Sequence, residues 1–294
     1  MEQSMQEASS LPIDVSHLTD EMGERKPSPP LADLSGHRGH HARIIALANQ
    51  KGGVGKTTTS INLAASLATA GRRVLLVDLD PQGNATMGSG IDKRGLKATV
   101  YQVLLGEAPL SAVRLRSQSG GFDVIPANRE LAGAEVEMVD LPERETRLKT
   151  ALEEIRDQYD FVLIDCPPAL NLLTVNGLCA ANAVMIPMQC EYYALEGLSD
   201  LVQTIKKVRV NLNPGLEIEG LLRTMYDPRN MLAQQVSDQL QQHFGDKVYR
   251  TIIPRNIRLA EAPSHGLPVL NFDRQSKGAL AYLALAGEML GKSV

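Results

Sequence analysis

A glycine-rich run, Lys51-Gly52-Gly53-Val54-Gly55-Lys56-Thr57-Thr58, constrains the fold of this chain more than any other segment. It follows an apolar segment at 43–49 and precedes a helical pattern that begins near Thr58. Glycines let backbone N–H groups turn inward, and the start of the following helix adds positive potential at the same point. A strand, a glycine-rich turn and a helix in this order predict a cradle for the phosphates of a nucleoside triphosphate.

The two lysines of this run have different expected tasks. Lys56 can neutralise the β- and γ-phosphates, and the hydroxyl of Thr57 can bind Mg²⁺. The common P-loop pattern has a further glycine at position 50, but this chain has Gln50 there, followed directly by the second lysine, Lys51. Because the cradle is complete without Lys51, this lysine needs a function of its own.

Composition restricts the class of protein. The 294 residues suffice for one large α/β domain or two small ones, and 43% hydrophobic residues without Trp predict an aliphatic core. The net charge of −4 gives no global sign of nucleic-acid affinity, so any such surface must be local. Three cysteines without a CxxC pair are interpreted as reduced thiols of a cytoplasmic protein. We expect neither a secretory signal nor a membrane span, because no run approaches ~18 apolar residues.

The chain divides into two parts by composition. Residues 1–42 combine prolines, serines and acidic residues without a sustained apolar period, which predicts a disordered N-terminal tail. Residues 43–294 form the predicted nucleotide-binding domain. His37, His40 and His41 lie near the end of the tail, where a solvated linker is favoured over a metal site.

Apolar strands alternate with helical patterns from residue 43 onward. Expected strands are 44–49, 73–78, 122–126, 161–165, 183–187, 217–225 and 248–253, and expected helices are 58–70, 143–158, 195–212, 231–244 and 277–290. Strands that are apolar at every position indicate a mostly parallel, twisted sheet with helices on both faces. In such α/β folds ligands bind at the carboxyl ends of the strands, so residues that follow each strand are candidate site residues.

Acidic residues follow two of these strands. Asp78 and Asp80 end the second strand, where one can hold the water shell of a metal and the other can orient the attacking water. An ordinary strand-end turn is the alternative, since Asp-Pro is common in turns. Asp165 ends the 161–165 strand and fits the acidic element that supports Mg²⁺ in P-loop enzymes. Cys166 is interpreted as a passenger beside it.

These segments carry a resemblance to a known family. KGGVGKTTT, VDLDPQGNAT and LIDCPP, with residues 189–198 and 253–266, resemble the ParA/Soj chromosome-partitioning ATPases, which belong to the deviant Walker A group together with MinD. The resemblance runs from about residue 43 to 290 and leaves out the tail. That tail is too short for the helix-turn-helix domain of the longer plasmid partition ATPases. The implied fold is that of P-loop NTPases.

The resemblance implies a Mg²⁺-dependent ATPase that works as an ATP-sandwich homodimer. Lys51 would cross the interface to the partner's phosphates, as an arginine finger does, while Lys56 would bind the β- and γ-phosphates within its own chain. Gly52, Gly53, Val54 and Gly55 would form the phosphate cradle between them. A centromere-binding partner of the ParB/Spo0J type would stimulate hydrolysis and release the dimer.

The resemblance also assigns roles to the remaining residues. Thr57 would bind Mg²⁺, Thr58 would reach the α-phosphate, Asp80 would position the hydrolytic water beside the metal, and Asp165 would support the metal. Adenine would be held near the ends of late strands, by Met225 and by the segment Pro254, Arg255 and Asn256.

Nucleic-acid binding has weaker support from the residues themselves. Residues 201–260 hold nine Lys/Arg against five Asp/Glu, a local charge of +4, which leaves 21 basic against 29 acidic residues, or −8, elsewhere. An ordinary solvated surface explains this equally well. The resemblance favours nonspecific contact with double-stranded DNA on the nucleoid, through Lys206 and Arg229. Residues 226–230, which include Arg229, form a loop one residue shorter than is usual in that family.

Two rival functions were weighed. A MinD-like membrane-associated ATPase needs a basic amphipathic C-terminal helix, but residues 279–290 are rich in Ala and Leu and predict a core helix. An iron–sulfur reductase needs two cysteines per chain for a cluster shared between subunits, and no such cradle is evident. The sequence therefore favours no membrane contact and no cluster.

Overall fold

The computed structural model describes residues 42–291. The predicted tail (1–42, apart from Ala42) and its histidine cluster lie outside the described residues, so both stay predictions.

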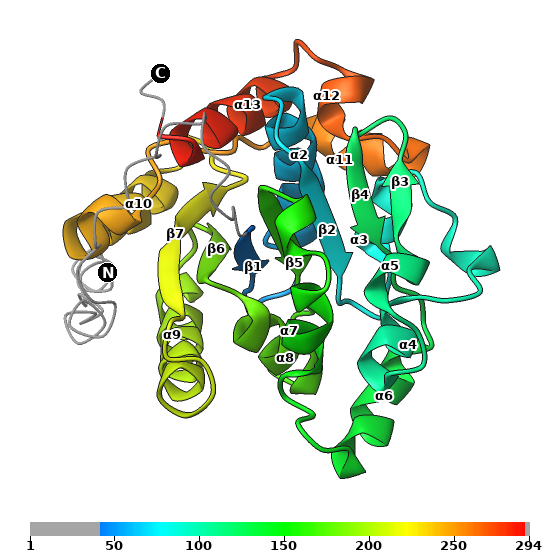
Figure 1. Cartoon of the computed structure of the whole chain (residues 1–294). Helices are drawn as coiled ribbons and strands as arrows, with labels where there is room; N and C mark the ends of the chain where they lie inside the picture. The colour runs from blue at the N-terminus through cyan, green and yellow to red at the C-terminus, as the bar shows by residue number, and fades with distance from the viewer. Residues whose placement is uncertain (1–41, 292–294) are drawn as a thin grey trace, which may run out of the picture.

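A seven-stranded sheet forms the centre of the described chain (Figure 1). Its order is β3-β4-β2-β5-β1-β6-β7, and only the pairing of β3 with β4 is antiparallel. This confirms the mostly parallel sheet. The strands are β1 (Arg43–Leu47), β2 (Val74–Asp78), β3 (Leu115–Ser117), β4 (Phe122–Ile125), β5 (Phe161–Asp165), β6 (Ala183–Gln189) and β7 (Glu217–Thr224).

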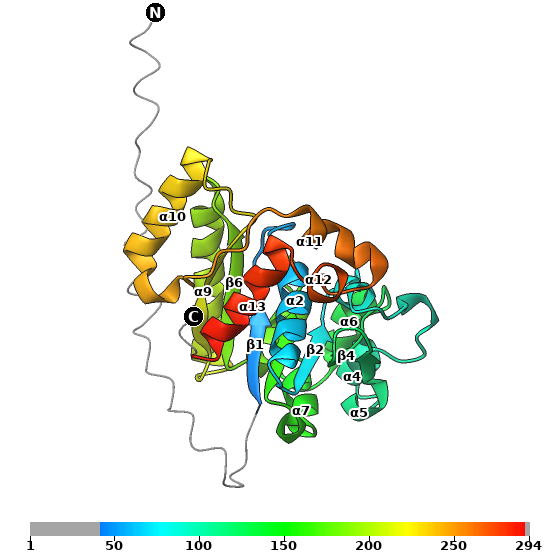
Figure 2. The same cartoon turned by 90° about the horizontal axis from the view of Figure 1, so that it is seen from above.

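Helices cover both faces of the sheet (Figures 1 and 2). One face carries α2 (Lys56–Thr69), α11 (Ile257–Glu261), α12 (Val269–Phe272) and α13 (Lys277–Met289). The other carries α4 (Val100–Leu105), α5 (Leu110–Val113), α6 (Leu131–Glu137), α7 (Arg147–Glu153), α8 (Leu172–Ala180) and α9 (Ala194–Asn211). The short α3 (Asn84–Gly88) follows β2, and α10 (Met231–Phe244) lies at the β7 edge.

Burial on both faces explains why the strands are apolar throughout. All five residues of β2 and all five of β5 are buried, including the aspartates that end them. Aliphatic side chains dominate the two core clusters, and Tyr282 and Phe122 are the largest fully buried side chains. Because the aspartates end strands in the middle of the sheet, the fold itself brings their carboxylates beside the glycine-rich run.

The C-terminal helix α13 is a core helix, as predicted. Ala279, Tyr282 and Leu285 are buried against the same cluster as α2, and the hydroxyls of Tyr282 and Thr59 lie 3.0 Å apart. A helix that lies on a membrane needs a free apolar face. The described part of α13 therefore uses its apolar face in the core of the domain. Within residues 42–291, every helix is too short or too polar to cross a bilayer.

Two predicted elements were wrong in extent. The helix expected at 143–158 is only α7, followed by a single 3-10 turn at Arg156–Gln158. Pro142 and the positive φ of 53° at Glu143 explain the late start. Helix α2 begins at Lys56, two residues before the expected start, directly after Gly55 with its φ of 88°.

The strand expected at 248–253 does not form. This segment runs beside β7 with isolated bridges, which pair Val248 with Leu221 and Pro254 with Tyr226. The N–H groups of Arg250 and Thr251 donate to the carboxylate of Glu288 in α13, at 2.8 and 2.9 Å. A side chain of another element therefore takes donors that a regular ladder would require.

Gly220 permits the close approach of this segment to β7. A Cβ atom at Gly220 would lie 2.8 Å from the carbonyl oxygen of Lys247 and 3.0 Å from the ring of Tyr249. We expect Gly220→Ala to lower the free energy of unfolding by about 1–3 kcal/mol, because backbone cannot give way to the added methyl group. Urea denaturation followed by circular dichroism measures the change.

Gly197→Ala is the matched control, since nothing lies within 4 Å of a Cβ atom at Gly197 in α9. There the same change should raise stability by about 0.5–1 kcal/mol through helix propensity. Equal stability of the Gly220→Ala and wild-type proteins would contradict the close-approach argument.

Candidate phosphate-binding site

The glycine-rich run forms a loop that is held to the sheet from two sides. Gly53 and Gly55 adopt φ angles of 74° and 88°, in the left-handed region that favours glycine. The hydroxyl of Thr224, the last residue of β7, donates to the carbonyl oxygen of Val54 at 2.7 Å. The side chain of Asn49 accepts from the N–H of Lys51 at 3.0 Å. The loop therefore has a fixed shape directly after β1, at the N-terminus of α2.

Lys56 is buried within this loop. Its ammonium group donates to the carbonyl oxygen of Lys51 at 3.2 Å, and only 7% of the residue is exposed. Burial lowers the pKa of Lys56, while the nearby carboxylates of Asp165 and Asp80 oppose that shift. A buried cation with a single neutral partner is suited to receive an anion.

Thr57 lies against the carboxylate that ends β5. Its hydroxyl donates to Asp165 Oδ2 at 2.7 Å, and the hydroxyl of Ser60 donates to Asp165 Oδ1 at 2.9 Å. Burial, and after it the neighbouring charge of Asp78, raises the pKa of the Asp165 carboxyl. A divalent cation beside Thr57 and Asp165 would favour the ionised carboxylate, so these oxygens fit Mg²⁺.

The two aspartates after β2 have different environments. Asp78 is fully buried, and its Oδ2 accepts from the N–H and the hydroxyl of Thr86 at 2.8 and 2.7 Å. Asp80 is half-buried, and its Oδ1 accepts from the N–H of Gln82 at 2.9 Å. Asp78 thus fixes the turn, whereas the second carboxylate oxygen of Asp80 accepts no hydrogen bond within the described residues and lies near Lys56. Of these two aspartates, Asp80 is therefore the candidate to act on a ligand.

Lys51 stands on the outside of the loop. Its side chain is 45% exposed, and its ammonium group forms an ion pair with Glu191, which follows β6 by two residues. The backbone carbonyl of Lys51 accepts from Lys56, while the ammonium group of Lys51 pairs with this carboxylate. The two lysines of the run therefore differ in environment, with Lys56 buried and Lys51 exposed.

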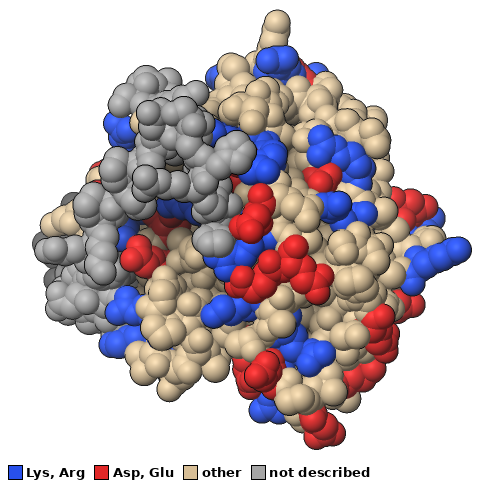
Figure 3. All heavy atoms as spheres, in the orientation of Figure 1, with Lys and Arg blue, Asp and Glu red and all other residues tan. Residues whose placement is uncertain are grey.

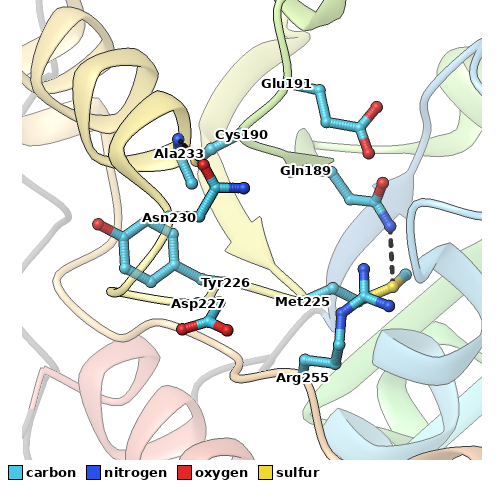
Figure 4. Close-up of a pocket in the computed structure, with 9 residues that line it drawn as sticks. All are labelled: Gln189, Cys190, Glu191, Met225, Tyr226, Asp227, Asn230, Ala233 and Arg255. Atoms are coloured by element: carbon cyan, nitrogen blue, oxygen red, sulfur yellow. Dashed lines mark hydrogen bonds between the residues drawn. The ribbon is translucent and has the colours of Figure 1, made fainter.

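A small pocket of about 250 Å³ adjoins the loop (Figure 4). Figure 4 shows Gln189, Met225 and Arg255 grouped on one side of it, with Tyr226 and Asn230 on the other. The other residues that line it are Cys190, Glu191, Asp227 and Ala233. The pocket lies next to the P-loop, because Met225 follows Thr224 and Glu191 pairs with Lys51.

The predicted adenine contacts divide between this pocket and its border. Met225 has a φ of 48° and receives a hydrogen bond at its sulfur from Gln189 Nε2 at 2.8 Å. Arg255 lines the pocket with it. Pro254 pairs with Tyr226 beside the pocket, and the side chain of Asn256 accepts from the N–H of Arg258 as the cap of α11. The structure therefore brings Met225 and Arg255 together and gives Asn256 a capping role.

The two predicted DNA contacts lie on separate elements. Lys206 is exposed on α9, and Arg229 lies in the loop between β7 and α10 with 88% of its side chain exposed. Both oxygens of Asp227 accept from Arg229, at 3.0 and 2.8 Å. The hydrogen bonds from Arg229 lower the pKa of Asp227 to about 2. Arg229 must therefore exchange a carboxylate for a phosphate to bind DNA.

The three cysteines are buried and carry no disulfide. Burial raises the pKa of each thiol, which keeps it protonated and unreactive. Cys166 follows Asp165 as a buried thiol, and its interpretation as a passenger stays a prediction.

Four residues of the site were missed by the sequence reasoning. Ser60 lies one turn beyond Thr57 on α2, and Thr86 lies in α3 beyond a loop. Thr224 and Glu191 lie at the ends of β7 and β6, where the rule that ligands meet strand ends could have identified them. No sequence pattern in a single chain pairs Glu191 with Lys51, since 140 residues separate them.

Comparisons with known proteins agree with this geometry. The family described as AAA domain matches residues 42–218. The chromosome partitioning protein ParA of Caulobacter vibrioides is 54% identical over 252 residues, which cover 85% of this chain and 94% of that protein. The sporulation initiation inhibitor protein Soj of Bacillus subtilis is 55% identical over 247 residues, covering 84% and 98%.

A solved structure is similar as well. Cobyrinic acid a,c-diamide synthase from Mycobacterium smegmatis, with bound ATP analogue and magnesium, has a TM-score of 0.75 and 41% identity, and covers 85% of this chain and 94% of its own. Its name describes another activity, whereas the Caulobacter relative, at higher identity, is named a chromosome partitioning protein. On the strength of these relatives and of the loop, acids and sheet described above, the chain belongs to the ParA/Soj family of chromosome-partitioning ATPases.

Proposed function

We propose that this protein is an ATP-driven DNA-partitioning switch, in which two copies close around ATP, bind DNA and separate after hydrolysis. The observation that carries the proposal is the pair of lysines on one loop. Lys56 is buried where it can serve its own nucleotide, and Lys51 is exposed where it can serve that of a second copy. A second lysine in the loop that stays exposed suits a nucleotide held between two copies.

ATP with Mg²⁺ is the proposed ligand of the loop. The N–H groups from Gly52 to Thr58 and the start of α2 favour the phosphates, and Lys56 adds a positive charge. Thr57 and Asp165 would hold Mg²⁺, which supplies charge neutralisation to the phosphates when bound. Thr58 is half-buried at the same helix start, beside the α-phosphate position that the family implies.

Asp80 is the proposed catalytic carboxylate. It is half-buried, follows the central strand β2, and is held in its turn by the N–H of Gln82. A carboxylate there can accept a proton from the attacking water and orient it toward the phosphorus. Met225, Pro254, Arg255 and Asn256 stay the proposed adenine contacts.

The remaining proposals concern partners. Lys206 and Arg229 would contact DNA phosphates without regard to sequence, which would place the ATP-bound dimer on the nucleoid. A centromere-binding protein of the ParB/Spo0J type would stimulate the turnover. The experiment that tests the whole proposal is a DNA mobility shift with ADP, ATP and a non-hydrolysable ATP analogue at two salt concentrations. A shift that is equal with ADP and ATP would refute the switch.

Asp80→Ala should bind ATP and DNA but lower kcat for hydrolysis by about a hundredfold or more, because the attacking water loses its base. Phosphate release and nucleotide affinity are measured on the same preparation. Lys56→Ala should instead lose nucleotide binding and, with it, the DNA shift.

Two variants make this test specific. Asp80→Asn retains a side-chain oxygen that accepts from the N–H of Gln82, so it keeps the turn while removing the catalytic base. Asp140→Ala removes an exposed carboxylate from the 3-10 turn that follows α6 and should hydrolyse ATP normally. Normal hydrolysis by both Asp80 variants would exclude Asp80 as the catalytic carboxylate.

Lys51 must leave Glu191 before it can reach a second copy. We expect Glu191→Gln to lower the ATP concentration that gives half-maximal dimer by up to about fivefold, since exposed ion pairs contribute at most about 1 kcal/mol. Sedimentation velocity in the Asp80→Ala background, where turnover is blocked, measures this concentration.

Lys51→Gln should bind ATP as a monomer and fail to dimerise. Glu154→Gln, at an exposed position after α7, is the matched control and should behave as wild type. If Glu191→Gln weakened the dimer, Glu191 would be a contact within the dimer rather than a restraint on Lys51.

Lys206→Gln and Arg229→Gln should each weaken DNA binding equally for all sequences and reduce the slope of log affinity against log salt by about 1. Asp227→Asn should strengthen DNA binding, because it releases Arg229 from its carboxylate partner. Fluorescence anisotropy at several salt concentrations gives both quantities. Lys149→Gln, an exposed change on α7, should alter neither, and an unchanged slope in both test variants would contradict the assignment.

A further inference from the structure

A second cavity, of about 450 Å³, lies at the amino ends of the parallel strands, opposite to the P-loop at their carboxyl ends. It is bordered by the residues that follow α2, by the β3–β4 hairpin and by the segment before β5. The amino ends of β2, β4 and β5 meet there, whereas the P-loop follows the carboxyl end of β1. The cavity is therefore separate from the nucleotide site.

Four arginines line this cavity: Arg72, Arg73, Arg114 and Arg116, which we call the arginine pocket. Asp123 is the acidic residue in its lining, and Asp160 pairs with Arg73 beside it. Four positive charges against two negative ones leave +2, on a chain whose net charge is −4. Figure 3 shows Lys and Arg side chains gathered around fewer acidic ones over α2, β2 and β4.

The existing contacts use only part of the donors. Arg73 Nη2 donates to Asp160 at 2.8 Å and Arg116 Nη1 to Asp123 at 2.9 Å. Arg114 Nη1 donates to the hydroxyl of Tyr159 at 2.9 Å and to Gln158 Oε1 at 2.7 Å. Each guanidinium has five N–H donors, so most remain available. Arg72 Nε is buried and has no hydrogen-bond partner within the described residues. A buried donor without an acceptor is unfavourable unless a ligand supplies one.

Capping of α2 does not account for these arginines. The carbonyl oxygens of Ser66, Leu67 and Ala68 already accept from the N–H groups of Ala70, Arg72 and Gly71, at 3.0–3.1 Å. Positive charge after a helix end is favourable, which explains a single arginine there. It does not explain Arg114 and Arg116, because they come from the hairpin on the other side of the cavity.

We propose that the arginine pocket binds a small phosphorylated anion. Guanidinium groups match phosphate oxygens in a bidentate geometry, and several of them around one cavity suit a phosphate or diphosphate group. The volume is that of a small-molecule site. Duplex DNA fits less well, because a buried donor in a concave site cannot meet the phosphates of a rigid double helix.

Inorganic phosphate, pyrophosphate and ribose 5-phosphate are the probes that test this. Each is titrated calorimetrically into the full chain carrying Lys56→Ala in metal-free buffer, so that the P-loop contributes little. Saturable binding is expected, and Arg72→Gln with Arg114→Gln should weaken it at least tenfold. Pyrophosphate binding tighter than that of phosphate would identify a diphosphate group, and tighter ribose 5-phosphate would identify a sugar phosphate.

Two further variants keep the test decisive. Arg72→Lys retains the positive charge but loses the bidentate guanidinium group and its buried Nε, so it should weaken binding severalfold. This single variant gives a result even if the double variant fails to fold. Arg94→Gln removes an arginine whose side chain is 83% exposed outside the pocket, and should leave binding unchanged. ATP binding by the Arg72 and Arg114 variants with Lys56 intact should equal that of wild type, which separates this site from the proposed function.

Two outcomes would overturn the proposal. One is phosphate or pyrophosphate binding that the Arg72 and Arg114 changes do not affect. The other is a loss of DNA affinity in those variants without any loss of pyrophosphate binding, which would assign the pocket to DNA.

Discussion

The carboxylate of Asp165 joins the phosphate loop to the centre of the sheet. It ends β5, which lies between β2 and β1, and it accepts hydroxyl hydrogen bonds from both Thr57 and Ser60. These two residues lie three positions apart on one face of α2, so the contact fixes the rotation of the helix about its axis. The rotation of α2 in turn sets where Lys56 and the N–H groups of the loop point. This buried acid therefore positions the phosphate cradle together with the contacts of Thr224 and Asn49.

The environment of the same acid is suited to a cation. Burial and the charge of Asp78 both oppose ionisation of Asp165, and hydroxyl donors offset this only in part. A divalent ion beside Thr57 would supply the missing positive charge without disturbing the helix contact. Asp78 does not compete for that ion, because Thr86 and the N–H of Asp80 occupy its oxygens.

The parallel sheet and most of the site were predictable, because each rests on local pattern. Continuous apolar runs mark β1, β2, β5 and β6, and the acids and glycines follow directly after them. The prediction of a strand at 248–253 was wrong, because a residue distant in sequence changes the hydrogen bonding of this segment. Glu288 of α13 takes backbone donors from residues 250–251, so no strand forms there.

Contacts between distant side chains were equally hidden from the sequence. Residues 84–140 fold into short elements of three to seven residues, which leave little periodicity to detect. The partner of Lys51 lies 140 residues away, and that of Arg229 lies two residues away. Only the pairing of Arg229 with Asp227 could be inferred from the sequence spacing. Whether this pair matters depends on how exposed Arg229 is, which the sequence does not give. The charge count over residues 201–260 includes Arg229 and Asp227 as independent charges, although the two form an ion pair.

The two ends of the parallel strands attract anions by different physical means. At the carboxyl ends, the start of α2 presents N–H groups and the positive end of the helix dipole, so a few side chains suffice. At the amino ends, α2 finishes and its dipole is negative, which disfavours an anion. A site there must therefore gather its positive charge from side chains alone. Four arginines from two segments supply that charge, and a surplus of +2 remains after the charges of Asp123 and Asp160.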